Sequence, residues 1–252
     1  MQNLQKKIKR FWDKRLFLKK NLKVCCEDLL LTKLENNIIL KYIKKNKKIL
    51  DIGCGNGETI KFIIKKIYYK KITGVDSNEN LLKAAKVGTD KNVNFIKFNL
   101  LHDDYTILKQ LKSDTIICKR VVHNFDYIDQ KSILKKIFLI MKKNSQILFF
   151  CTFKDGLNKI NKIRKVFNLP LIKEPYYNKY PFLKNIKKYF EDNNIKILQT
   201  TDFASTYFLG SRVLQSLLES NVNYNSKINK FFYKLKNIEG MGMNYFILGK
   251  KY

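Results

Sequence analysis

Between residues 47 and 153 the sequence alternates short apolar runs with amphipathic stretches, and this alternation constrains the fold more than any other feature. Apolar runs of this length fit buried strands, and the stretches between them place apolar residues at helical spacing. Strands that alternate with helices form βαβ units, whose parallel sheet carries helices on both faces. The pattern predicts strands at 47–53, 71–76, 92–99, 113–118 and 145–153, and helices at 57–67, 78–87, 105–112 and 127–143.

Two more apolar runs, at 194–199 and 243–251, bring the prediction to seven strands in one α/β layer. A helix is also predicted near the N-terminus, where Asp28 can cap a run of regularly spaced apolar residues. We therefore expect one domain over 1–252. Its predicted parts are a helical N-terminal cap at 1–45, a core at 46–153, and two lid inserts at 154–180 and 201–241.

The composition predicts a cytoplasmic protein. Its 252 residues, of which 45% are apolar, suffice for a sizeable core. The apolar runs stay below the roughly 18 residues that a membrane span needs, and the basic N-terminus lacks the apolar segment of a secretory signal. The five cysteines lack the paired spacing of a zinc site, so we expect reduced thiols and no metal.

The sequence DIGCGNG at 51–57 joins the first predicted strand to the first predicted helix. Glycines at such a turn let the backbone approach a ligand that a Cβ would exclude. Glu58 replaces the third glycine of the dinucleotide fingerprint, so a nicotinamide cofactor fits poorly. Asp51, at the strand end, favours a cationic or amine-bearing ligand. The alternative interpretation is a tight strand-to-helix connection without a ligand.

Polar residues also lie at the ends of the second and third predicted strands. Asp76, in GVDS at 74–77, is placed to accept hydrogen bonds from ribose hydroxyls. Asn99, which follows Phe98, can accept a hydrogen bond from an adenine amino group. The alternative roles are a helix cap for Asp76 and an Asx turn for Asn99.

Together these segments resemble the class I S-adenosylmethionine-dependent methyltransferases. The resemblance covers about residues 47–153 and rests on DIGCGNG, GVDS, the FN that follows the third strand, and CKRVVHNF after the fourth. It implies an α/β fold with a Rossmann-like, seven-stranded, mostly parallel sheet whose last strand is antiparallel. It also implies an enzyme whose cofactor is S-adenosylmethionine.

The resemblance further implies which residues hold the cofactor. The methionine half would lie on Gly53, Cys54 and Gly55, with Asp51 near its amino group. Asp76 would hold the ribose, and Asn99 with Leu100 the adenine. The candidate cofactor-binding residues are Asp51, Gly53, Cys54, Gly55, Asp76, Ser77, Asn99, Leu100 and Cys118.

The residues after the fourth strand and the two inserts are the candidates for the acceptor site. His123 follows the fourth strand, where it could act as a general base for a hydroxyl, or instead pack under the next helix. Trp12, the only tryptophan, either folds over the cofactor or anchors packing. The inserts combine aromatic and polar side chains, as lids do. The candidate acceptor-binding residues are Arg120, Tyr176, Tyr177, Asn178, Tyr207 and Arg212.

The charge of +30 raises the question of a nucleic-acid substrate. Only five of the 51 basic residues are arginines, which bind phosphates and bases better than lysines do, and the lysines are dispersed. The sequence therefore favours methyl transfer to a small polar acceptor, such as O-methylation of a sugar or related metabolite. An RNA methyltransferase and a non-catalytic protein that binds the cofactor are the alternatives.

Overall fold

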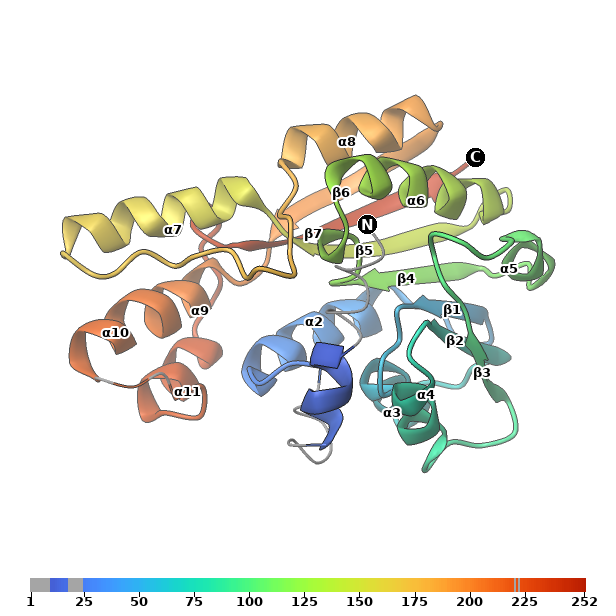
Figure 1. The fold of residues 1–252 in the computed structure, drawn as a ribbon, viewed down its shortest axis with the longest axis horizontal. Coiled ribbons are helices and arrows are strands. Elements are labelled where there is room, and N and C mark those ends of the chain that lie inside the picture. Colours follow the sequence, from blue (N-terminus) through green and yellow to red (C-terminus); the bar gives the residue numbers. More distant parts are fainter. Residues whose placement is uncertain (1–9, 18–24, 220, 222) are drawn as a thin grey trace.

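A seven-stranded sheet in the order β3-β2-β1-β4-β5-β7-β6 forms the centre of the molecule (Figure 1). The structure, a computed structural model, describes residues 10–17, 25–219, 221 and 223–252. β7 runs antiparallel to both of its neighbours, and the other strand pairs are parallel. The strands are β1 Lys48–Ile52, β2 Lys71–Asp76, β3 Val93–Lys97, β4 Thr115–Lys119, β5 Gln146–Thr152, β6 Ile195–Asp202 and β7 Asn244–Lys251. The predicted fold is thus confirmed.

Four helices connect the strands of the core in the predicted alternation. They are α3 Glu58–Ile64, α4 Glu79–Lys86, α5 Thr106–Gln110 and α6 Tyr127–Ile140, and α8 Leu183–Asp192 precedes β6. Outside this alternation lie α2 Leu29–Tyr42, α7 Lys154–Val166, α9 Ser205–Leu209, a π-helical turn at Gly210–Leu214, α10 Gln215–Leu218 and α11 Lys227–Lys234. No helix within the described ranges is both long enough and apolar enough to cross a membrane.

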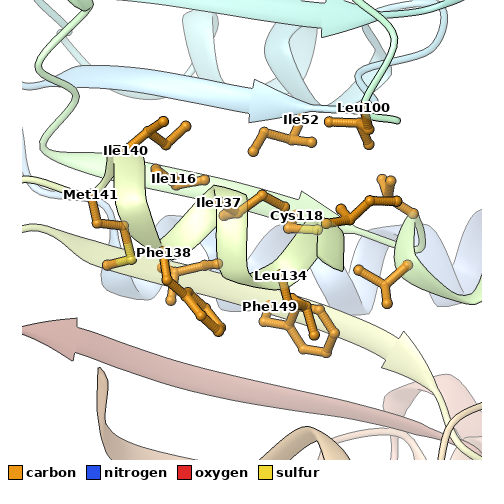
Figure 2. Packing of buried hydrophobic residues seen from close by; sticks show 14 of the residues in the cluster. Ile52, Leu100, Ile116, Cys118, Leu134, Ile137, Phe138, Ile140, Met141 and Phe149 are labelled. Atoms are coloured by element: carbon orange, nitrogen blue, oxygen red, sulfur yellow. The ribbon is translucent and has the colours of Figure 1, made fainter. Parts of the chain in front are cut away.

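Helices cover both faces of the sheet because its strands are apolar on both sides. On one face α5, α6 and α8 bury one hydrophobic cluster, and on the other α2, α3, α4 and α7 bury a second. Figure 2 shows the first cluster, where Leu134, Ile137 and Phe138 of α6 pack toward Cys118 and Phe149 of the sheet. These five side chains are almost completely excluded from solvent.

The order of the strands places a crevice at one edge of the sheet. β1 pairs with β2 on one side and with β4 on the other, so the chain leaves β1 and β4 in opposite directions across the sheet. Ligands of open α/β sheets bind outside the carboxyl ends of the strands at such a switch point. The loops after β1 and β4 therefore face one another there.

The N-terminal segment and the two inserts lie outside the core of the sheet and its covering helices. α2 begins where Asp28 Oδ1 accepts a hydrogen bond from the Leu31 amide, which is the predicted cap. The first insert contains a regular helix, α7, before an irregular segment, and the second contains α9 to α11. Figure 1 shows α7, α9, α10 and α11 grouped at one end of the molecule, away from α3 and α4.

Candidate functional site

A cavity of about 640 Å³ lies at the carboxyl ends of β1 to β4. Residues from four successive strand-to-helix connections line it, and Trp12 and Cys25 from the N-terminal cap complete it. Of the candidate cofactor and acceptor residues, the lining includes Asp51, Gly53, Cys54, Gly55, Asp76, Ser77, Asn99, Leu100 and Arg120.

The glycine turn after β1 forms the floor of the cavity, and two of its glycines are required sterically. Gly53 has φ +66°, and a Cβ there would come within 2.3 Å of Val121 Cγ2. Gly55 has φ +55°, and a Cβ there would come within 2.6 Å of Cys25 Sγ. Positive φ and close packing exclude side chains at both positions. Both glycines line the cavity, so the backbone of the turn can lie directly against a ligand.

Asp51 places an unpartnered carboxylate oxygen at this floor. The residue is 2% exposed, and its Oδ2 makes no hydrogen bond within the described part of the chain. Burial raises the pKa of Asp51 to about 7, although the nearby positive charge of Lys119 opposes the shift. A buried carboxylate without a partner is costly, and a bound cation would relieve that cost. Asp51 thus fits the ammonium group of a ligand.

Asp76 fixes the turn from the end of β2. Its Oδ2 accepts a hydrogen bond from the Gly55 amide at 2.9 Å, and its Oδ1 accepts one from the Asn78 amide at 2.8 Å. Burial raises the pKa of Asp76, while these backbone hydrogen bonds oppose the shift. Each oxygen has a second lone pair, so the carboxylate can also accept hydrogen bonds from ligand hydroxyls.

Asn99 forms the Asx turn that was one of its two predicted roles. β3 ends at Lys97, and Asn99 Oδ1 accepts a hydrogen bond from the Leu101 amide at 3.0 Å. The Asn99 amide itself donates to Asp103 Oδ2 at 2.8 Å. Asn99 still lines the cavity beside Phe98 and Leu100, so these contacts orient it without removing it from the site.

A buried cluster of charges borders the cavity, and one of its members, Glu58, directly follows the glycine turn. Lys119 Nζ lies 3.1 Å from Glu58 Oε2 and 3.7 Å from Glu35 Oε2. Arg120 Nη2 lies 3.4 Å from the same Glu35 oxygen, and Glu35 is completely buried. With Asp51, the cluster contains three carboxyl groups and two cations. This excess of carboxyl groups favours a cationic ligand in the cavity.

The residues after β4 and the helix at 10–17 complete the lining of the cavity. Asn124, Phe125, Asp126 and Asp129 come from the former, and Trp12 comes from the latter. Hydrogen bonds connect the helix at 10–17 to the start of α4. Asp13 Oδ1 accepts these bonds from the side chains of Asn78 and Asn80.

Aromatic contacts connect this helix to the first insert. Phe11 packs on Tyr177 with ring centroids 4.3 Å apart, and Trp12 packs on the same ring at 6.3 Å. Tyr176 also contacts Phe11 and Tyr177. Tyr176 and Tyr177 therefore support Trp12, and neither of them is part of the cavity lining.

His123 and Cys118 lie behind the cavity and not on its surface. His123 is 5% exposed, and its Nδ1 accepts a hydrogen bond from the Thr152 amide at 3.4 Å and contacts Cys151 Sγ. Burial and the charge of Arg120 lower the pKa of His123 to about 3. These contacts agree with the packing role that was the alternative for His123. Cys118 is fully buried in the hydrophobic cluster under α6.

The other insert residues also belong to packing contacts in this structure. Arg212 Nη2 forms an ion pair with Asp28 Oδ2 at 2.9 Å, and Tyr207 donates a hydrogen bond to Asp28 Oδ1 at 2.6 Å. Asn178 is buried, and its Oδ1 makes no hydrogen bond to any described residue. None of these three residues lines the cavity. The second insert thus buttresses the N-terminal cap.

Sequence reasoning missed several residues of the lining. Lys119, Asn124 and Phe125 belong to CKRVVHNF, which carried the resemblance, but they were not among the candidate site residues. Asp126 and Asp129 follow this segment, and no sequence signal marks Cys25. The place of Lys119 and Cys25 in the site depends on contacts between α2 and the loops after β1 and β4.

The chain matches known methyltransferases in sequence and in structure. The family described as "Methyltransferase domain" matches residues 43–228, which is well over half of the chain. A probable S-adenosylmethionine-dependent methyltransferase of Saccharomyces cerevisiae, CRG1, is 25% identical over 64% of this chain, and the match spans only 52% of that relative. A ubiquinone biosynthesis O-methyltransferase of Coxiella burnetii is 27% identical over 66% of this chain and 73% of its own length.

The fold has solved counterparts. A SAM-dependent methyltransferase from Archaeoglobus fulgidus superposes with a TM-score of 0.57 over 88% of this chain and 93% of its own, at 23% identity. The cavity also fits S-adenosylmethionine on chemical grounds, since Asp51 offers an unpartnered carboxylate and the glycine turn offers bare backbone. The chain belongs to the class I S-adenosylmethionine-dependent methyltransferases.

Proposed function

We propose that this enzyme methylates a hydroxyl group of a small polar acceptor, a sugar or a related metabolite. The observation that carries the proposal is the part of the cavity lining that Trp12 and the residues after β4 contribute. Small-molecule sites are concave and largely apolar, with a few polar groups that orient the ligand. A cavity of about 640 Å³ is within the usual range for such sites.

The side chains in this part of the cavity lining suit a ring that carries several hydroxyls. Trp12 and Phe125 offer apolar surfaces against which the face of a ring can pack. Asp126, Asp129 and Asn124 offer oxygens that accept hydrogen bonds from hydroxyl groups. The relative from Coxiella burnetii is named an O-methyltransferase, which supports oxygen as the accepting atom.

We also propose which residues perform each step. Asp51, Asp76, Asn99 and the glycine turn would hold S-adenosylmethionine, which would supply an electrophilic methyl group for the acceptor oxygen and a neutral thioether as the leaving group. Asp129, partly buried in the lining, receives the proton that leaves the hydroxyl. Most of the rate enhancement would come from alignment of the two reactants.

An incubation with radiolabelled S-adenosylmethionine and metabolite, glycan and RNA fractions tests this function. We expect label in a small polar metabolite, and a loss of about 10²-fold or more in kcat for Asp129→Asn because proton transfer is impaired. His123→Gln is the matched control, since His123 does not line the cavity, and it should retain turnover. Salt-sensitive label in RNA would instead support the nucleic-acid alternative. Cofactor binding without turnover on any fraction would support the non-catalytic alternative.

A further inference from the structure

The end of the molecule farthest from α3 and α4 carries a group of exposed apolar side chains (Figure 1). They come from the last turn of α7, the segment that follows it, and α10. Two of them are largely exposed, since Val166 is 78% exposed and Leu218 is 72% exposed. The group, here named the apolar tip, consists of Val166, Phe167, Leu171, Leu217 and Leu218.

Arg164 holds the three segments of the apolar tip together. Its side chain is largely buried, and its Nε donates a hydrogen bond to the Pro170 carbonyl at 2.8 Å. Its Nη1 donates to Ser216 Oγ at 3.0 Å and also to the Arg212 carbonyl. Pro170 precedes Leu171, and Ser216 precedes Leu217. One arginine thus places the apolar residues of both inserts side by side.

Exposed lysines accompany the part of the apolar tip that comes from the first insert. They are Lys162 and Lys165 on α7, and Lys173 after Leu171. Glu219, which follows Leu218, accepts a hydrogen bond from Gln215 Nε2. The first-insert part of the tip therefore combines exposed apolar side chains with positive charge.

We propose that the apolar tip docks on the surface of a membrane that contains anionic phospholipids. Contiguous apolar patches on a soluble fold mark interaction sites. Exposed apolar side chains combined with lysines are the pattern of peripheral membrane binding, in which lysines contact headgroups and apolar groups enter the interface. Figure 1 shows that α7 and α10, which carry three residues of the tip, extend away from the sheet. This inference is independent of the proposed acceptor.

Vesicle sedimentation of the full chain tests the proposal. Because the whole chain carries +30, the test needs a variant with the same charge change elsewhere. Val166 and Val87 form such a pair, since each follows an exposed lysine and they are 78% and 72% exposed. With vesicles of phosphatidylcholine and phosphatidylglycerol, Val166→Asp should lower the partition coefficient by about fivefold or more, whereas Val87→Asp should change it by less than about twofold. Equal effects of the two variants would overturn the proposal.

Insertion is measured separately with a fluorescent reporter. In a Trp12→Phe background, Phe167→Trp should show a blue-shifted emission on these vesicles and quenching by brominated lipids, and Val87→Trp should show neither. Emission from position 167 that is unchanged by vesicles would refute docking. A dimer in gel filtration that Val166→Asp abolishes, with no binding to vesicles, would also refute it and would assign the tip to self-association.

Discussion

The affinity for S-adenosylmethionine should depend on pH through Asp51. Burial raises the pKa of this carboxyl to about 7 in the free protein, so it is about nine-tenths ionised at pH 8 and about one-tenth ionised at pH 6. Only the ionised form attracts the ammonium group of the cofactor. Loss of that attraction should weaken binding about tenfold between pH 8 and pH 6, which is about 1.4 kcal/mol.

Calorimetric titration of the wild type and of Asp51→Asn at several pH values measures this effect. The ratio of the two affinities cancels the titration of the cofactor and that of Asp76, whose pKa burial also raises. We expect this ratio to fall about tenfold as the pH decreases from 8 to 6. Affinities of the two proteins that follow parallel curves would show that Asp51 does not hold the ammonium group.

The raised pKa of Asp51 also predicts that the stability of the folded protein changes with pH. Stability should fall as the pH rises, whereas the affinity for the cofactor should increase. Because the pKa of Asp51 is raised on folding, its contribution favours the folded state at low pH and is lost as the pH rises through about 7. Ionisation then costs up to about 4 kcal/mol at pH 8. Asp51→Asn should therefore raise the free energy of unfolding of the cofactor-free protein at pH 8, in urea denaturation, and have little effect at pH 4. A variant less stable than the wild type at pH 8 would contradict this.

Three further predictions follow from the contacts of other residues. His123→Ala should lower the free energy of unfolding by about 1–3 kcal/mol in urea denaturation while kcat/KM changes less than about threefold, because His123 packs behind the cavity. Arg212→Ala should destabilise the fold by about 3–5 kcal/mol through the buried charge left on Asp28, and Asp28→Asn in the same chain should recover part of that loss. Cofactor binding should change the fluorescence of Trp12, the only tryptophan and part of the lining, and an unchanged emission at saturation would place Trp12 outside the site.

Local sequence determined the core of this protein and the cofactor side of its site. The alternation of apolar runs and amphipathic stretches specified the strands and helices, because side-chain periodicity is a property of the backbone geometry. Parallel strands bring their carboxyl ends to one edge, so the positions of Asp51, Asp76 and Asn99 at successive strand ends suffice to predict that they converge. The role of the glycines in the first turn could also be predicted from the sequence, because a positive φ is a local steric requirement that favours glycine.

Tertiary structure alone decided the acceptor side and the roles of the inserts. Arg212 and Tyr207 appeared suited to bind an acceptor, yet both contact Asp28, about 180 positions earlier in the chain. His123 appeared suited to be a base, but the packing of the segment that ends at Tyr180 buries it. These contacts join segments that are far apart in the sequence, and local hydrophobic periodicity gives no information about them. Whether a side chain is buried depends on the contacts that such distant segments make together. The sequence therefore determines which ligand the strand ends can hold, and the packing of distant segments decides which side chains reach it.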